Sequence, residues 1–396
     1  MRLGAAVARC AKAGCDVRLS LISAALVAAL VGYGSTIALV LAAATALGAT
    51  SAQTTSWVFA ICIAKAIGSA SLSWWNRMPV VLAWSTPGAA LIAASSGVSM
   101  AQAVGAFIAT GVLITLTGFF GPLERLITRI PMQIAAGMLG GVLLPFCLKV
   151  PAEAAHLPAL ILPIIGVFLL VRLWQPNFAV LAALGAGLLL TFGRGTPLPM
   201  GGSTHPALAF IWPEWSSGAI LGLGLPLYLV TMASQNLPGF AVLKGAGFTP
   251  PVQAVLRVTG LLSTVSAFFG SHPINMAAIT AAICLDDTVH PDKSQRWKVA
   301  LAYASAWIGL GVFTPVILAG LAALPVALIA TVAGLALITP LTGALGAGFT
   351  ATEGRFAAAA TLIVAASGVS AYGIGGAFWG LLAGLAVHGS SALRRG

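Results

Sequence analysis

The amino-acid sequence predicts an all-α, polytopic membrane protein with about 14 transmembrane segments in two inverted repeats. Three observations support this fold class: the composition, the length of the apolar runs, and a proline pattern that occurs twice, half a chain apart. Of the 396 residues, 59% are hydrophobic and 7% are charged, whereas soluble domains carry roughly 25% charged residues. Such a chain cannot cover a soluble surface, which excludes a cytosolic enzyme, a disordered protein and a coiled coil.

The apolar runs are long enough to cross a membrane as helices. A helix needs about 20 apolar residues to span a bilayer, and the run from 19 to 47 is also too long for a signal peptide. A β-barrel would alternate polar and apolar residues instead. An interfacial helix is expected at 121–130. The expected spans are 19–47, 54–76, 79–96, 99–120, 131–149, 157–174, 177–193, 216–237, 251–269, 271–285, 296–318, 324–341, 356–368 and 370–388.

The basic residues indicate the orientation. The net charge is +11, and the cations lie between the apolar runs. With the N-terminus in the cytoplasm, most of the 19 Lys and Arg side chains fall on the cytoplasmic side, as the positive-inside rule requires. We therefore expect a multi-pass protein of the lipid bilayer with both termini cytoplasmic and an even number of spans. The same distribution argues against a nucleic-acid partner.

Two spans are expected to be broken near their middle. The segment 85–87 (Ser-Thr-Pro) is matched by 271–273 (Ser-His-Pro), and small residues follow each. Proline in the first helical turn after Ser or Thr is a helix-start signal. Each crossing would then be a short strand followed by a half-helix, and the half-helices would enter from opposite faces and meet at the midplane. The alternative is that both prolines only kink ordinary helices.

The residues at these breaks belong to the predicted substrate site. The N-terminus of a helix has free N–H groups and a positive dipole end, so two such ends at the midplane favour an anion. Acidic residues are almost absent from the spans, which also indicates an anionic substrate. The predicted substrate-binding residues lie in the first span, at the two breaks and late in the eighth span: Tyr33, Ser85, Thr86, Pro87, Gly88, Ser234, Gln235, His272, Ile274, Asn275 and Met276.

Several of these polar residues also have a purely structural interpretation. Tyr33 can pack instead of presenting its ring to an aromatic ligand, and the polar cluster at 234–236 can join helices instead of contacting substrate. Asn275 is expected in the first turn of the second half-helix, where it either contacts substrate or serves as a local cap. Lys65, in the middle of its span, can attract an anion, pair with another group or bond to freed carbonyl groups.

His272 is the predicted proton-coupling residue. Histidine titrates near neutral pH, and histidines inside membranes recur in proton relays. The alternative is a neutral histidine that is hydrogen-bonded to the backbone at the break. The sequence contains no nucleotide-binding or metal-binding motif and no catalytic constellation, so we expect no enzyme activity, no metal and no cofactor.

At these positions the chain resembles the benzoate:proton symporter (BenE) family. The resemblance rests on Thr231–Phe240 (TMASQNLPGF) and His272–Cys284 (HPINMAAITAAIC), and it covers nearly the whole chain. It implies the fold of the nucleobase/ascorbate and sulfate-permease transporters.

This fold implies a division into two domains. The core domain would comprise residues 1–120 (spans 1–4) and 201–318 (spans 8–11). The gate domain would comprise residues 121–200 (spans 5–7) and 319–396 (spans 12–14). Homodimers are common in such folds.

The resemblance also implies an activity. This is secondary active, proton-coupled uptake of benzoate or a related aromatic carboxylate across a bacterial inner membrane, by an elevator-like alternating access in which the core moves against the gate. In the nucleobase-carrying relatives, glutamates on span 8 and at the span-10 break hold the substrate. In this sequence Ser234–Gln235 and His272 stand near those places, and the absence of carboxylates there fits an anionic substrate. The rival hypothesis is a passive channel or exchanger for small organic anions on the same fold.

Overall fold

The computed structural model describes the chain except at 1, 121–130, 194, 196–204, 278, 288, 373 and 394–396, and it describes the backbone alone at 2–18 and 391–393. The expected interfacial helix at 121–130 therefore lies outside the described residues. The principal elements in chain order are α1 (Arg2–Ala46), α2 (Ser51–Asn76), β1 (Leu82–Trp84), α3 (Thr86–Ala93), α4 (Met100–Phe119), α6 (Met132–His156), α7 (Pro158–Trp174), α8 (Ala179–Gly193), α9 (Ser217–Ala219), α10 (Leu225–Thr231), α11 (Leu237–Gly245), α12 (Val252–Ala267), β2 (Ile274–Met276), α13 (Ile279–Leu285), α14 (Lys298–Val312), α15 (Thr314–Ala322), α16 (Val326–Phe349), α17 (Arg355–Ala366), β3 (Ser370–Ala371), β4 (Ile374–Gly375) and α18 (Gly376–Leu393).

The helices have the lengths of a polytopic membrane protein. In the described part of the chain, 7 helices are long and apolar enough to cross a membrane. The number is 8 when the bent pair of helices α14 and α15 is counted as one span. The shorter apolar helices α7, α12 and α17, the last helix α18, and the strand–helix segments β1–α3 and β2–α13 supply the remaining segments. The predicted all-α fold, with about 14 segments and two strand–helix interruptions, is confirmed.

Two segments in the second half differ locally from the expected helices. The helix expected at 296–318 breaks after Val312, and its two parts are bent by 57°. Pro315 lies in the first turn of α15, where its missing N–H costs no helical hydrogen bond. The span expected from residue 370 starts with the β3–β4 hairpin, and its helix begins only at Gly376.

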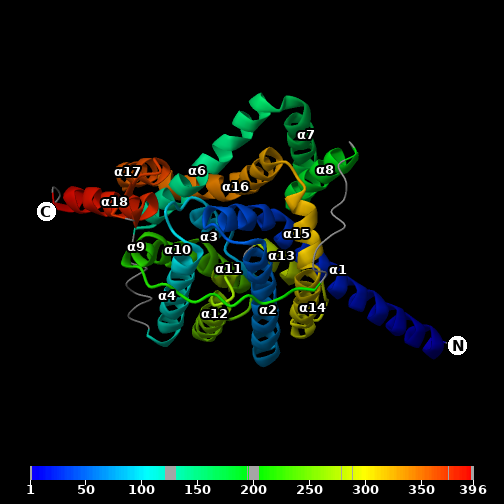
Figure 1. Cartoon of the computed structure of the whole chain (residues 1–396). Helices are drawn as coiled ribbons and strands as arrows, with labels where there is room; N and C mark the ends of the chain where they lie inside the picture. Colours follow the sequence, from blue (N-terminus) through cyan, green and yellow to red (C-terminus); the bar gives the residue numbers. More distant parts are fainter. Residues whose placement is uncertain are drawn as a thin grey trace.

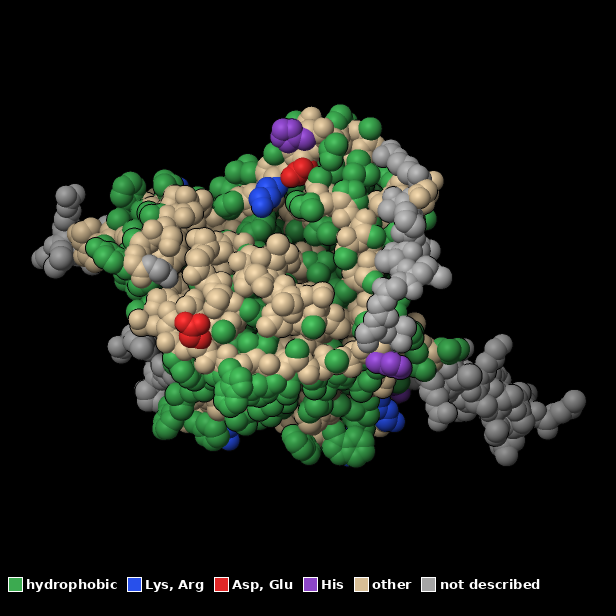
Figure 2. Space-filling view, in the orientation of Figure 1, with side chains coloured by type: hydrophobic (Ala, Val, Ile, Leu, Met, Phe, Trp, Pro, Cys, Tyr) green, Lys and Arg blue, Asp and Glu red, His purple; other side chains and the backbone are tan. Residues whose placement is uncertain are grey.

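The helices pack into two groups that lie side by side (Figure 1). The strand bundle contains β1 and β2 with α1–α4 and α9–α15, and α4 packs along α12 as α2 packs along α14. The flanking bundle contains α6–α8 and α16–α18, and α6 packs against both α16 and α17. Across the boundary, α3 and α10 contact α6. Charged side chains are sparse on the face shown in Figure 2, as expected for helices in a bilayer.

The two central strands form an antiparallel pair within the strand bundle. Their register pairs Leu82 with Met276. The N–H of Ile274 donates to Ser263 Oγ (3.0 Å), and the N–H of Met276 donates to Asn236 Oδ1 (2.8 Å). Backbone outside a helix is tolerated at membrane depth only where protein groups satisfy it. The polar side chains of α12 and of the turn before α11 do this for β2.

The second break differs from the prediction. α3 begins at Thr86 directly after β1, so Pro87 lies in its first turn as expected. In the second segment, however, Pro273 precedes β2, and α13 begins only at Ile279. Asn275 is therefore a strand residue, and its predicted place in the first turn of a half-helix is wrong. The reason is tertiary: the residues after Pro273 pair with β1, and proline is compatible with the start of a strand as well as of a helix.

Arg296 holds the loop that follows α13. Its guanidinium donates to the carbonyl oxygens of His290 (2.9 Å) and Leu285 (3.4 Å), and Nη1 lies 2.7 Å from Asp287 Oδ1. The Asp287 side chain is 92% exposed, so this ion pair contributes about 1 kcal/mol or less.

The two partners of this ion pair should therefore differ in their effect on stability. We expect Asp287→Asn to leave the thermal midpoint nearly unchanged. Arg296→Met should lower the free energy of unfolding by about 1–3 kcal/mol, because buried carbonyl groups lose their donor. Thermal unfolding of both purified variants in detergent measures the difference, and equal midpoints would contradict it.

Candidate functional site

A cavity of about 200 Å³, which we call the central cavity, lies in the strand bundle against α16. Thr86 at the start of α3 and Ile279 at the start of α13 both line it, so the two half-helices begin at one space. No Asp or Glu is among the described residues of its wall. The other polar side chains that line it are Ser35, Thr36, Lys65, Ser234, Gln235, Thr280, Tyr303 and Thr339.

Neighbouring side chains shape the start of α3. Ser85 is the N-cap, and its Oγ accepts a hydrogen bond from the N–H of Gly88 (3.0 Å). Thr86 Oγ1 is hydrogen-bonded to Thr36 Oγ1 of α1 (2.7 Å). A Cβ atom at Gly88 would lie 2.7 Å from both Ser85 Oγ and Leu227 Cδ1, so only glycine fits without a shift. Ser85 and Gly88 thus act on the helix start, whose positive dipole end lies at the central cavity.

Lys65 is the only Lys or Arg among the described residues that line the central cavity. It lies on α2 and is fully buried. Its Nζ is 2.9 Å from the centroid of the Trp307 ring and 4.5 Å from that of Trp84, and it makes no hydrogen bond with any described residue. Tyr33 packs on the same two rings. The Lys65 head group therefore has an aromatic cage, and no counter-ion accompanies it in the described structure.

Ser234 and Gln235 reach the central cavity from a widened helical turn between α10 and α11. The N–H of Leu237 donates to the carbonyl oxygen of Met232, a bond over five residues instead of four. Pro238 follows directly and has no N–H of its own. Widened turns of this kind occur often at functional sites. The turn leaves Ser234 and Gln235 half-buried beside the start of α3.

A second cavity of about 370 Å³, the apolar cavity, adjoins the central cavity. Both are lined by Ser234, Gln235 and Pro340. Its other walls are apolar and come from both bundles, including Leu139 of α6 and Leu229 of α10. The arrangement places a space for a hydrocarbon group next to a polar space with a cation.

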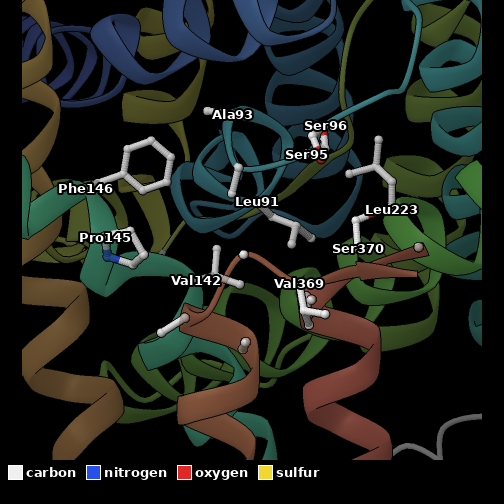
Figure 3. A pocket seen from close by; sticks show the side chains of 18 of the residues that line it. Leu91, Ala93, Ser95, Ser96, Val142, Pro145, Phe146, Leu223, Val369 and Ser370 are labelled. Carbon is white, nitrogen blue, oxygen red and sulfur yellow. The ribbon is translucent and has the colours of Figure 1, made fainter. Parts of the chain in front are cut away.

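A third cavity of about 230 Å³, the distal cavity, lies farther along the boundary between α3 and α6 (Figure 3). Leu91 and Ser95 line it from α3 and the loop that follows, and Val142 and Phe146 line it from α6. The apolar cavity instead meets the first turns of the same two helices. One boundary between the bundles therefore carries a cavity at each end.

The predicted site residues separate into those that reach a cavity and those that do not. Thr86, Ser234 and Gln235 meet in the central cavity, and Pro87 lines the apolar cavity. Tyr33 is 5% exposed and does not line the central cavity, although its neighbours on α1 do. Its ring contacts match the packing interpretation.

The predicted residues around β2 lie away from the central cavity. His272, Ile274, Asn275 and Met276 are all fully buried, and none of them lines its wall. The Asn275 amide donates to the carbonyl oxygen of Met276 (2.8 Å) and accepts from the N–H of Ser85 (3.0 Å). Asn275 thereby connects β2 to the residue that caps α3.

His272 has a fixed partner on α2. Its Nδ1 accepts a hydrogen bond from Trp57 Nε1 (2.9 Å). An indole N–H is a donor only, so a proton on Nδ1 would set two donors against each other. The proton-coupling role of His272 stays a prediction, and this contact requires Nδ1 to remain an acceptor.

The central cavity also contains residues that the sequence patterns did not single out. Thr36 is near Tyr33 in the sequence, but only its bond to α3 places it at the site. Thr280 reaches the central cavity because it is the second residue of α13, which begins at Ile279. Tyr303 donates from Oη to the carbonyl oxygen of Leu82 (3.0 Å), a contact between distant segments. None of these three residues has a local signal of comparable strength to a proline break.

Comparison with known proteins reveals relatives over nearly the full length of the chain. The sequence profile of the family described as "Benzoate membrane transport protein" (BenE) matches residues 15–390. The inner membrane protein YdcO of Escherichia coli is 40% identical over 363 residues, which cover 91% of this chain and 93% of that protein. The benzoate membrane transport protein of Acinetobacter baylyi is 32% identical over 377 residues, which cover 94% of this chain and 95% of that protein.

Solved transporter structures share the fold. The transmembrane domain of the cyanobacterial bicarbonate transporter BicA has a TM-score of 0.62 at 13% identity, and the match covers 93% of this chain and 97% of that chain. SLC26A9 also has a TM-score of 0.62 at 13% identity, over 94% of this chain and 66% of that chain. At such identities the likeness concerns the fold, which consists of two inverted repeats. Together with the family match and the sequence relatives, these findings identify a multi-pass membrane transporter that belongs to the BenE family of benzoate membrane transport proteins.

Proposed function

We propose that this protein takes up benzoate or a related aromatic carboxylate together with protons, as a secondary active transporter. The observation that carries the proposal is the central cavity, which presents a lysine, hydroxyl groups and an amide, with no carboxylate among its described lining residues. A bound carboxylate needs hydrogen-bond donors and a positive potential, whereas a bound cation would need acidic partners. The Acinetobacter relative that is named for benzoate transport supports the same substrate class.

The substrate would place its carboxylate in the central cavity and its ring in the apolar cavity. Gln235 offers an amide donor and Thr86 a hydroxyl group, and the start of α3 adds its positive dipole end. The Ser234 hydroxyl already donates to the carbonyl oxygen of Val230 (2.6 Å). The ring would contact Leu139 and Leu229. An aromatic acid suits this division because its polar and apolar parts lie at opposite ends of a rigid molecule.

Transport would follow from movement of the strand bundle, as the core, against the flanking bundle, as the gate. We assign residues 1–120 and 201–318 to the core and residues 121–200 and 319–396 to the gate. If both termini are in the cytoplasm, as the distribution of basic residues predicts, the apolar cavity at the start of α6 would lie on the cytoplasmic side and the distal cavity on the outer side. Sliding of α3 along α6 would close one cavity while it enlarges the other.

Uptake of labelled benzoate into proteoliposomes tests the proposal. With an acidic exterior, we expect accumulation above equilibrium that a protonophore abolishes. Protein-free liposomes supply the background of benzoic acid that crosses bare lipid. Protein-dependent equilibration of benzoate that does not depend on the proton gradient would contradict symport and favour a channel or exchanger. Absence of protein-dependent flux would contradict benzoate as the substrate.

A further inference from the structure

We propose that Lys65, and not His272, binds the substrate carboxylate and carries the coupled proton. The inference rests on the proposed function, since it assigns a residue to the coupling of anion and proton. It goes further by placing both events on one side chain of α2. Three features of the structure support it: the isolation of the Lys65 head group, its place at the cavity, and the groups that surround it.

The Lys65 head group is buried without a hydrogen-bonding partner. Nζ has three possible donor positions when protonated, and none of them is used by a described residue. The faces of Trp307 and Trp84 make cation–π contacts with it, with Nζ 2.9 Å and 4.5 Å from the respective ring centroids. Lys65 also lines the central cavity, so an anion bound there would lie beside this side chain.

The energetics of such a group couple the proton to the anion. An ammonium that is removed from water without a counter-charge is costly, and aromatic faces offset only part of this cost. A carboxylate in the central cavity would supply both the missing charge and the missing acceptor. The protonated lysine and the bound anion therefore stabilise each other. Neither is as stable in the cavity without the other.

Among the described residues, the titratable groups around Lys65 include no carboxylic acid that could replace the substrate. Cys62 lies one turn away on α2, Tyr303 comes from α14, Tyr33 comes from α1, and His272 precedes β2. β1 and α15 contribute no titratable residue, and the single basic residue of α12 donates to the backbone of α4. No described residue of these elements brings a carboxylate to Lys65.

His272 is less suited to the same role. Its Nδ1 is occupied by the Trp57 N–H, and the residue does not line the central cavity. The proposed step on Lys65 is a simple protonation. The amine lone pair takes one proton from the outer side to form an N–H bond, and the same bond breaks when the proton is released with the anion inside. No electron transfer or further reactant is involved.

Four variants test this assignment in the benzoate uptake assay. Lys65→Arg keeps a cation that stays protonated in proteins, so exchange of labelled for unlabelled benzoate should survive while gradient-driven accumulation is lost. Lys65→Gln removes the charge and should weaken benzoate binding about 30-fold or more. His272→Gln should retain accumulation. Lys244→Arg, an exposed position at the end of α11, is the matched lysine control and should behave as the wild type.

A binding measurement keeps the test decisive if Lys65→Arg does not fold. Addition of benzoate to the wild-type protein in weakly buffered detergent should remove about one proton per benzoate bound from solution. In Lys65→Gln, saturating benzoate should remove none.

The outcomes separate this inference from the proposed function. Gradient-driven accumulation by Lys65→Arg, or benzoate binding by the wild type without proton uptake, would overturn the role of Lys65. Loss of coupling in His272→Gln, with coupling kept in the Lys65 variants, would also overturn this role and would identify His272 as the proton-carrying residue. A wild-type protein that moves no benzoate would contradict the proposed function itself.

Discussion

Replacing Gln235 with glutamate is expected to reduce benzoate uptake by about a hundredfold or more. Gln235 lines both the central and the apolar cavity, and glutamate keeps nearly the same shape while it adds a carboxylate. Two like charges brought together in a desolvated site cost several kcal/mol, and each 1.4 kcal/mol is about a tenfold change in affinity. Initial rates over a range of benzoate concentrations in proteoliposomes measure the effect, which should include a higher KM.

A matched exchange outside the cavities controls for the chemical change. Gln253 is exposed at the start of α12, where its Oε1 accepts from Arg257 Nη2 (3.2 Å). Gln253→Glu makes the same amide-to-carboxylate change there, so its uptake should remain close to that of the wild type. Undiminished uptake by Gln235→Glu would mean that Gln235 does not face the substrate carboxylate.

A methyl group at Gly260 is expected to destabilise the strand bundle by about 1–3 kcal/mol. α4 and α12 approach each other where Gly111 faces Gly260. A Cβ atom at Gly260 would lie 2.8 Å from the Gly111 carbonyl oxygen and would overlap the backbone nitrogen of Thr115. Backbone atoms cannot turn aside as a flexible side chain can, so the two helices must separate. Thermal unfolding of Gly260→Ala in detergent should show a lower midpoint.

Gly309 provides the comparison within the same bundle. It lies inside α14, and a Cβ atom there meets no atom within 4 Å. Alanine in place of glycine in a helix is otherwise favourable by roughly 0.5–1 kcal/mol. Gly309→Ala should therefore retain or raise the midpoint. If Gly260→Ala unfolds at the same temperature as Gly309→Ala, the close contact of α4 with α12 does not limit stability.

The site residues that could be predicted are those with a strong local signal. Thr86 belongs to a helix-start pattern, and Ser234 and Gln235 belong to a polar cluster just before Pro238; these three side chains meet in the central cavity. Lys65 was visible as a cation in mid-span, but its sequence neighbourhood left three roles open. Its aromatic cage comes from β1 and α14, which no pattern around Lys65 could indicate.

By itself the sequence determined the membrane class, the approximate spans and the presence of two interrupted crossings. Apolar length and helix-start chemistry act over a few neighbouring residues, so a linear pattern contains them. Only the tertiary structure decided that the residues after Pro273 form a strand, that His272 accepts from Trp57 and that Lys65 lines the cavity. These outcomes depend on hydrogen bonds and packing between segments far apart in the chain, and their free energies can reverse a local preference.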